Sequence, residues 1–332
     1  MKLASLKSGG RDGTLVVVNR ALTRAVACPK IAATLQAALD DWQNAAPRLN
    51  ALAERLELAE NALTIDAESV FALDFNALAA PLPRAYEFVD GSAYLPHVER
   101  VRKARGADVP TSFYVDPLMY QAVSAGFLGP RDAVLVTSEE YGIDLEAEVI
   151  IVTDDVPMAI DSESAAMHIQ LIGLINDVSL RNLIPNELAK GFGFLQSKPR
   201  SALSPVLVTP DELGPAWRFS KVHLPLRSKI NGEHFGAPQA GVDMQFSFAQ
   251  LIAHAAKTRP LAAGTIVGSG TVANQDESVG ASCLAEIRTL EVIRGGTATT
   301  PFMRFGDTVR IEMLDANGVS IFGAIEQKIT AA

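Results

Sequence analysis

Cysteine is scarce in this sequence, and its two cysteines are placed far apart. Cys28 and Cys283 are the only ones in a chain of 332 residues, and they form no short spacing of the kind that binds metals or cycles between redox states. This scarcity disfavours a disulfide-stabilised fold and a thiolate metal centre. A reducing compartment is the expected environment.

Long hydrophobic runs and an excess of basic charge are also missing. No window approaches the ~18 apolar residues of a membrane-spanning helix, and the opening MKLASLKSGGRDG has no apolar stretch typical of a secretion signal. Lys and Arg number 29 against 38 Asp and Glu, for a net charge of −9. That balance disfavours nucleic acid and anionic membranes as partners, and we expect a cytoplasmic protein.

What the chain does have is material for a large core, with 48% hydrophobic and 20% charged residues. Its length suggests two domains, and we predict a small β-rich domain over residues 1–82. That unit combines three short strands and a Gly-rich turn with two helices over 31–44 and 47–61, the second starting at Pro47. Pro81 and Pro83 indicate a linker to the second domain.

Residues 83–332 are predicted to be mostly strands, with one clear helix over 246–259. There is no alternation of strands with helices, so an α+β, mostly β domain is favoured over a doubly wound sheet. The expected strands cover 132–137, 147–153, 168–177, 205–209, 221–232, 265–270, 307–315 and 320–325.

An acidic pattern in YGIDLEAEVIIV, residues 141–152, raises a chemical question. Side chains alternate along a strand, so Asp144, Glu146 and Glu148 would share one face. A solvent-exposed strand explains such patterns without any function. The alternative is a hard divalent cation, which takes oxygen ligands. Asp177 favours the cation, because it follows an apolar run and would emerge from a buried strand, where an unpaired charge is costly.

A second acidic position lies close to a histidine. Asp90 precedes His97 by seven residues, and four basic residues follow the histidine. A surface histidine and a solvated helix face are the simplest readings of these residues taken alone.

Several segments together resemble the fumarylacetoacetate hydrolase family, in a bacterial subtype. The resemblance rests on Asp90 with His97 and on the order of the motifs from about residue 84 to the end of the chain. The first domain resembles the small β-rich domain that precedes the catalytic domain in fumarylacetoacetases. The motifs are DLEAEV, NDVSLRN, FLQSKPRSALSPVLVTPDELG, AGVDMQFSFAQLIAHAAKTRPLAAGTIVGSGTV and SCLAE.

The resemblance implies a divalent cation, Mg²⁺ or Ca²⁺, held by four carboxylates. The matching positions are Asp90, Glu146, Glu148 and Asp177. Asp144 matches no ligand position, and we expect it to lie behind the ligands or to face solvent. A ligand set made of carboxylates alone is also the set that a hard ion prefers.

The resemblance also implies a catalytic apparatus. His97 would take a proton from water, and Glu286 in SCLAE would orient its imidazole. Arg181 and Lys198 match cationic groups near the developing oxyanion.

Substrate contacts are implied at Tyr120 and Thr271, and Arg102 or Arg105 would pair with a substrate carboxylate. The sequence departs from the family pattern at three places, and these departures concern the shape of the substrate. Glu286 lies one residue further from Gly280 than expected, Ser201 is nearest to an expected threonine, and the segment after Arg181 lacks an expected glutamine and tyrosine.

The activity implied is metal-dependent hydrolysis of a carbon–carbon bond in a β-diketone. The leading substrate is 4-fumarylacetoacetate, cleaved to fumarate and acetoacetate in the catabolism of tyrosine and phenylalanine. A sibling enzyme is the alternative: an acylpyruvase, a 2-oxo acid decarboxylase or an isomerase acting on another diketo acid. A metal-stabilised scaffold without turnover is a third reading. Family members also suggest a homodimer.

Overall fold

The structure is a computed structural model that describes residues 1–59, 63–65, 68–104, 106 and 108–332. Arg105, one of the two arginines predicted to bind substrate, lies outside the described residues. No described helix has both the length and the apolar character needed to cross a membrane.

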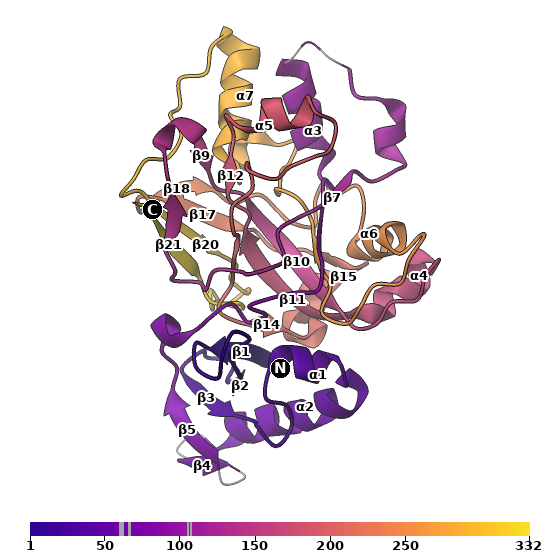
Figure 1. The fold of residues 1–332 in the computed structure, drawn as a ribbon, viewed down its shortest axis with the longest axis vertical. Coiled ribbons are helices and arrows are strands. Elements are labelled where there is room, and N and C mark those ends of the chain that lie inside the picture. The colour runs from indigo at the N-terminus through magenta and orange to yellow at the C-terminus, as the bar shows by residue number, and fades with distance from the viewer. Residues whose placement is uncertain (60–62, 66–67, 105, 107) are drawn as a thin grey trace.

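The first domain is an antiparallel sheet covered by two helices (Figure 1). Its sheet order is β4-β5-β3-β2-β1. Alternate residues of β2 contribute to two different cores: Leu15 and Val17 pack with the helices, whereas Val16 and Val18 pack on the opposite side. The elements are β1 Lys2–Leu6, β2 Thr14–Val18, β3 Arg24–Ala27, α1 Leu35–Leu39, α2 Trp42–Leu58, β4 Thr64–Ile65, β5 Glu68–Ala72 and the 3-10 helix η1 Phe75–Ala77.

The predicted helices of this domain exist, but their limits differ from the prediction. The second one begins at Trp42, so Pro47 lies inside α2 and not at its start. Pro47 is exposed, so its ring lies away from the packed face of α2, where Leu49, Leu52 and Leu56 are buried. This apolar face drives helix formation despite the missing N–H of proline.

The two domains share one sheet, which among the described residues has twelve strands. β1 pairs with β14 of the second domain, with Lys2 opposite Val208 and Leu3 opposite Leu207. The predicted linker is a packed segment, because Leu78, Ala80 and Leu82 are fully or almost fully buried.

The second domain places the rest of that sheet beside a second, five-stranded sheet. In the shared sheet the order continues β14-β11-β10-β19-β6-β7, and β13 pairs with β11 as the twelfth strand. The other sheet has the order β18-β17-β20-β21-β8. Its strands are β6 Phe88–Gly91, β7 Met119–Gln121, β8 Val134–Val136, β9 Ile143–Asp144, β10 Ala147–Thr153, β11 Ile169–Asn176, β12 Ser179–Leu180, β13 Ala202–Leu203, β14 Leu207–Val208, β15 Trp217–Arg218, β16 Lys221–Val222, β17 Arg227–Ile230, β18 Glu233–Gly236, β19 Ile266–Gly268, β20 Thr308–Glu312 and β21 Ile325–Ala331.

Helices surround these sheets, and three of them, α3, α5 and α7, gather at one end of the domain (Figure 1). Two others, α4 and α6, lie together at the side of the sheet. The helices are α3 Leu95–Ala104, α4 Ser162–Ala165, α5 Ile184–Leu188, α6 Phe248–Ala255 and α7 Leu284–Gly295, and the 3-10 helices are η2 Thr111–Tyr114, η3 Glu139–Tyr141, η4 Ala166–His168, η5 Pro210–Ala216 and η6 Glu277–Val279.

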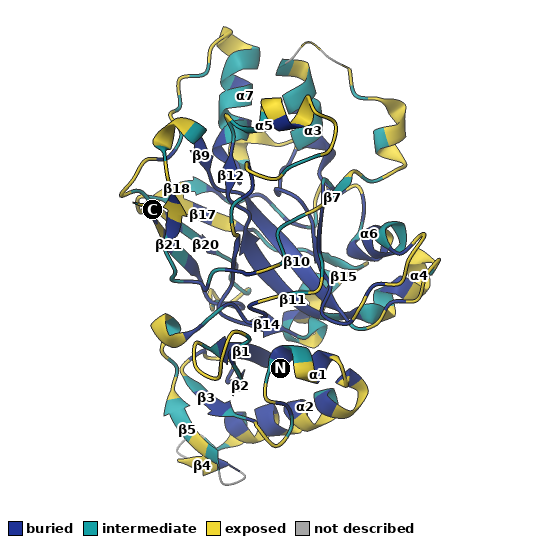
Figure 2. Cartoon of the chain, viewed as in Figure 1, coloured by how far each residue is buried: buried dark blue, intermediate teal, exposed yellow. Residues whose placement is uncertain are grey.

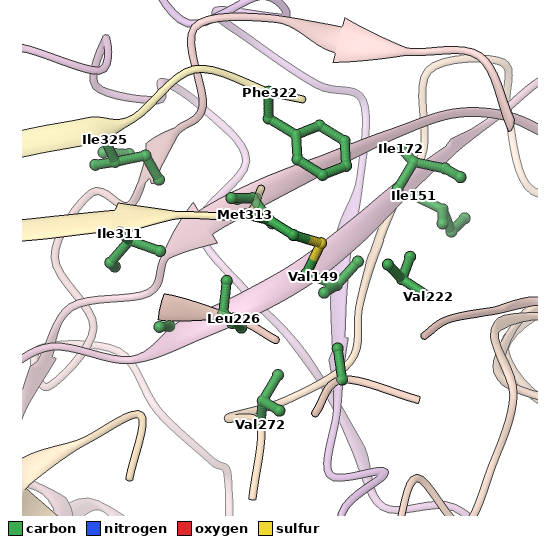
Figure 3. Packing of buried hydrophobic residues seen from close by; sticks show 14 of the residues in the cluster. Val149, Ile151, Ile172, Val222, Leu226, Val272, Ile311, Met313, Phe322 and Ile325 are labelled. Atoms are coloured by element: carbon green, nitrogen blue, oxygen red, sulfur yellow. The ribbon is translucent and has the colours of Figure 1, made fainter. Parts of the chain in front are cut away.

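Strands β10 and β11 form the centre of the domain and are buried on both faces (Figure 2). Val149 and Ile151 belong to the core between the two sheets, together with Ile172, Met313 and Phe322 (Figure 3). Ile150 and Val152, on the other face, join the core of the first domain. Burial on both faces explains the unbroken run of β-branched residues at 149–152.

The predicted acidic strand over 141–152 is interrupted. Its residues form the separate strands β9 and β10, with Leu145 and Glu146 between them. β9 leaves the main sheet to pair with β12, where Asp144 lies opposite Ser179. The three acidic residues therefore do not share one strand face.

Candidate functional site

Neighbouring strands bring three acidic residues to one end of the central sheet. Asp90 lies on β6, Glu148 near the start of β10, and Asp177 directly after β11. In the sheet β11, β10, β19 and β6 are adjacent in that order. Gly268 on β19 is opposite Asp90, and a Cβ there would lie 2.2 Å from Asp90 Oδ1. The glycine thus leaves room for the Asp90 carboxylate.

The carboxylates of Asp90, Glu148 and Asp177 are buried, and one oxygen of each lies within 4.8 Å of the others. Burial and the nearby Asp177 raise the pKa of Asp90 to about 8. Burial and the charge of Asp90 likewise raise the pKa of Glu148 well above its usual value. Oε2 of Glu148 has no hydrogen-bond partner among the described residues. An oxygen-rich, mutually repelling cluster with an unpartnered buried oxygen fits a hard divalent cation.

Glu146, the fourth predicted ligand, lies beside this cluster but is engaged by two cations. Its Oε2 accepts from Lys198 Nζ at 2.5 Å, and its Oε1 accepts from Arg181 Nη2 at 2.6 Å. Burial opposes ionisation of Glu146, but Arg181 and Lys198 outweigh it and hold its pKa below the usual range. The ligand role of Glu146 stays a prediction.

Lys198 connects two of the carboxylates. Besides Glu146, its Nζ donates to Asp177 Oδ2 at 2.6 Å. The same Asp177 oxygen accepts from the hydroxyl of Tyr120 at 2.9 Å, and the other oxygen accepts from Ser201 Oγ. Ser201, the residue nearest to the family threonine, is therefore a direct partner of Asp177.

Of the two placements expected for Asp144, the structure excludes the one facing solvent, because Asp144 is buried. Its carboxylate accepts from the backbone N–H groups of Leu284 at 2.7 Å and Ala285 at 2.9 Å, at the start of α7. It also accepts from Arg181 Nε at 2.8 Å. A carboxylate at a helix N-terminus satisfies free N–H groups and interacts favourably with the helix dipole. Asp144 thereby fixes both Arg181 and the helix that carries Glu286.

His97 and Glu286 are brought together by α3 and α7, which pack side by side. Nδ1 of His97 lies 3.2 Å from Glu286 Oε2. Because a carboxylate accepts, Nδ1 carries the proton in the neutral imidazole and the lone pair is left on Nε2. The Cys283 thiol lies within 4.8 Å of both groups. Burial raises the pKa of that thiol well above its usual value.

His97 and the acidic residues Asp90, Glu146 and Glu148 line one cavity of about 150 Å³. Asp177 is not among its lining residues. The other charged lining residues are Arg181 and Lys198, and Ile184 and Phe194 are apolar lining residues. The Phe194 ring packs edge-on against Tyr120 at 4.8 Å between ring centroids. Charged groups and an apolar wall in one cavity are typical of a small-molecule site.

The predicted substrate contacts have different placements. Tyr120 and Thr271 line the cavity, and Thr271 Oγ1 lies 3.5 Å from Glu148 Oε1. Arg102 is not among the lining residues, and its guanidinium stacks over the Phe113 ring at 5.0 Å. The role of each of these residues in binding stays a prediction.

Three residues at or next to the candidate site were not predicted as site residues: Arg100, Glu187 and Phe194. Arg100 follows His97 by three residues on a helix, so helical spacing could have placed them on one face. Glu187 and Phe194 carry no such signal, because their partners depend on how the chain folds back over residues 183–197.

The Glu187 carboxylate binds residues 195–197 at the far end of that segment, and we call these hydrogen bonds the Glu187 clasp. The buried carboxylate accepts from the backbone N–H groups of Leu195, Gln196 and Ser197 at 2.6–3.1 Å. It also accepts from Ser197 Oγ at 2.5 Å. Burial works against ionisation, yet these donors lower the pKa of Glu187 to about 2. The clasp sets the backbone immediately before Lys198 and holds Phe194 beside Tyr120.

Replacing Glu187 with glutamine should loosen this segment, because the amide keeps one acceptor oxygen for four donors. We expect faster hydrogen exchange at 195–197 and a lower kcat/KM, by about 10-fold if one to two kcal/mol of positioning are lost. The wild-type clasp should be intact above pH 4.5, its ordinary pKa, and be lost as the pH falls toward 2. Exchange at 195–197 that is equal in wild type and variant would contradict this role.

Comparisons with known proteins agree with this architecture. The fumarylacetoacetate (FAA) hydrolase C-terminal model matches residues 87–330, and the fumarylacetoacetase N-terminal domain 2 model matches residues 1–84. No curated protein matches the chain.

Solved structures with a similar fold cover the whole chain. A candidate HpcE protein from Mycobacterium smegmatis has a TM-score of 0.68 at 21% identity, each chain covered to 100%. A fumarylacetoacetate hydrolase from Exiguobacterium antarcticum has a TM-score of 0.65 at 16% identity, again with 100% of both chains covered. A 5-carboxymethyl-2-hydroxymuconate delta-isomerase from Mycobacterium smegmatis has a TM-score of 0.59 at 16% identity, covering 100% of this chain and 99% of its own.

The family expected from the motifs is therefore confirmed, as are the two-domain layout and the sheet-rich α+β fold. The exact boundary at residues 82 and 83 stays a prediction. With its catalytic-domain model matching most of the chain, this protein belongs to the fumarylacetoacetate hydrolase family.

Proposed function

We propose that this protein hydrolyses a carbon–carbon bond in a β-diketo acid, with 4-fumarylacetoacetate as the leading substrate. The observation that carries the proposal is the pairing of His97 with Glu286 at the edge of a cavity that Asp90, Glu146 and Glu148 also line. A positioned base beside a cation site is what addition of water to a carbonyl requires.

Asp90, Glu148 and Asp177, with Glu146 next to them, would hold Mg²⁺ or Ca²⁺. When bound, such an ion polarises a carbonyl and stabilises negative charge on its oxygen. The support lies in the donor set, which consists of carboxylate oxygens, and in the free Oε2 of Glu148. The choice of Mg²⁺ or Ca²⁺ as the bound ion is part of this proposal.

The proton transfers follow from the pairing of His97 with Glu286. His97 Nε2 takes a proton from water, and the hydroxide oxygen bonds to the attacked carbonyl carbon. The bond between that carbon and the central CH₂ then breaks, and its electron pair forms the enolate of the departing ketone. His97 returns the proton to the enolate carbon, so water is added across the broken bond to give an acid and a methyl ketone.

Lys198 and Arg181 line the cavity, and each is fixed by buried carboxylates. Their charges are in place before the reaction begins, so they need no reorganisation when the oxyanion forms. Tyr120 and Thr271 are proposed to contact the substrate, with Arg102 or Arg105 pairing with its carboxylate.

A second candidate is isomerisation or decarboxylation of a related 2-oxo acid. The isomerase alternative is favoured by the likeness in fold to the Mycobacterium smegmatis delta-isomerase. Product analysis separates the reactions, because hydrolysis adds water to give two products, decarboxylation releases CO₂ and isomerisation leaves the mass unchanged.

The test is turnover of 4-fumarylacetoacetate and a panel of acylpyruvates and 2-hydroxymuconate-type acids by purified protein with Mg²⁺. Formation of an acid and a ketone in equal amounts supports the proposal. Release of CO₂ or a product of unchanged mass from the panel would assign the protein to the second candidate.

We also propose that the protein works as a cytoplasmic homodimer, following the family expectation. The buried free cysteines Cys28 and Cys283 are compatible with a reducing compartment. Light scattering during size-exclusion chromatography measures the mass directly, and a value for one chain would contradict the dimer.

A further inference from the structure

A buried arginine stands behind the proposed catalytic pair. Arg100 lies one turn after His97 on α3 and is only 8% exposed. A buried guanidinium is costly unless each side of it finds an acceptor. Its partners therefore indicate what it does.

Arg100 contacts both α7 and the loop after β19. Its Nη1 donates to Glu286 Oε1, and its Nη2 donates to the carbonyl oxygens of Asn274 at 2.7 Å and Gln275 at 3.1 Å. Each oxygen of the Glu286 carboxylate thus has its own partner, Oε1 with Arg100 and Oε2 with His97.

The loop is itself firmly held. The Asn274 amide donates to the carbonyl oxygens of Gln239 and Val242, and its own oxygen accepts from the Gln239 N–H. Arg100 is consequently anchored to a fixed backbone on one side. On its other side Arg100 binds the Glu286 carboxylate. Among the described residues, the other ion-pair partner of this carboxylate is His97 in its protonated form.

We propose that Arg100 is a positioning residue that acts through Glu286: it fixes the carboxylate so that the carboxylate can fix His97. This inference rests on the proposed function. Without the guanidinium, the Glu286 carboxylate can rotate about its side-chain torsions, and the imidazole loses its defined orientation and tautomer.

Lysine cannot replace Arg100 fully. A guanidinium offers a planar fork that reaches the carboxylate and two carbonyl oxygens together, whereas an ammonium group is a point charge. Arg100→Lys should therefore recover part of the activity that Arg100→Met loses.

The test is a double-mutant cycle with Glu286→Gln, measured on the diketone that the wild type hydrolyses. Arg100→Met should lower kcat about 10- to 100-fold and change KM by no more than about twofold. In the Glu286→Gln background the same replacement should cost no more than about twofold, because the carboxylate that orients His97 is already absent. Lys103→Met, an exposed cation on the same helix, is the matched control and should keep wild-type kcat.

Two kinetic results would overturn the inference. One is unchanged kcat in Arg100→Met. The other is an equal fold loss with and without the Glu286 carboxylate, which would mean that Arg100 acts only by holding the loop at 274–275.

A readout without turnover keeps this test separate from that of the function. In ¹⁵N-histidine NMR spectra, with His97 assigned by loss of its signal in His97→Gln, the wild type should show one neutral tautomer protonated at Nδ1. Arg100→Met should show a mixture of tautomers, and an unchanged single tautomer would contradict the inference. If the wild type gave the expected spectra but hydrolysed no diketone, the proposed function would fail and the positioning role would stand.

Discussion

Replacing His97 with alanine should lower kcat for diketone hydrolysis by about 10²- to 10⁴-fold, the usual contribution of a positioned general base. KM should change little, because the imidazole is proposed to act on water and not to bind the substrate. The replacement removes a half-buried ring whose hydrogen-bond partner is Glu286 at 3.2 Å. The melting temperature should stay close to that of the wild type, which separates loss of chemistry from loss of fold.

His254→Ala is the matched control for this experiment. His254 is half-buried on α6 and lies 3.4 Å from the exposed Asp116, outside the cavity. We expect wild-type kcat in that variant. Full activity in His97→Ala would remove the histidine from the mechanism, whatever the control shows.

Replacing Glu148 with glutamine should have the largest effect on the response to metal. Glu148 is fully buried, and Oε2 has no partner among the described residues. A bound divalent ion stabilises the wild type by about 2.7 kcal/mol at 100 times its Kd. The glutamine variant should lose most of this gain. In the presence of a chelator, however, it should melt at a higher temperature than the wild type, because without metal the wild type must bury the Glu148 charge or take up a proton on folding, and glutamine does neither.

Thermal unfolding with EDTA and with a series of Mg²⁺ and Ca²⁺ concentrations measures both effects. Glu233→Gln removes an exposed carboxylate from β18 and should leave the metal response intact. A Glu148→Gln protein that gained as much stability from metal as the wild type would contradict the proposed site.

Much of the candidate site followed from local sequence. The β-branched residues at 149–152 predicted a strand, and the mostly apolar run at 169–175 predicted a buried strand. Asp177 after the second run was expected to be costly without a partner. The motifs around Asp90, His97 and Glu286 supplied the rest, since a resemblance covering most of the chain implies their meeting. The structure brings Asp90, Glu148 and Asp177 together, and pairs His97 with Glu286.

Other features could not be read from the sequence, because their causes lie far along the chain. Asp144 looked like part of an acidic strand face, yet its partners are backbone groups 140 and 141 residues away at the start of α7. Arg100 looked like one member of a solvated basic cluster, and only the packing of α3 on α7 gives it Glu286. The prolines at 81 and 83 suggested a linker, but pairing of β1 with β14 draws this segment into the core.

The proposed reaction requires a divalent cation among these carboxylates, beside His97. Anomalous diffraction from crystals soaked in Mn²⁺, a stand-in for Mg²⁺ or Ca²⁺, tests it most directly. We expect an anomalous peak within coordination distance of oxygens of Asp90, Glu148 and Asp177, with Glu146 completing the ligand set, on the side of the cavity that His97 lines. A peak at another place, or none among these residues at a concentration that raises the melting temperature, would contradict it.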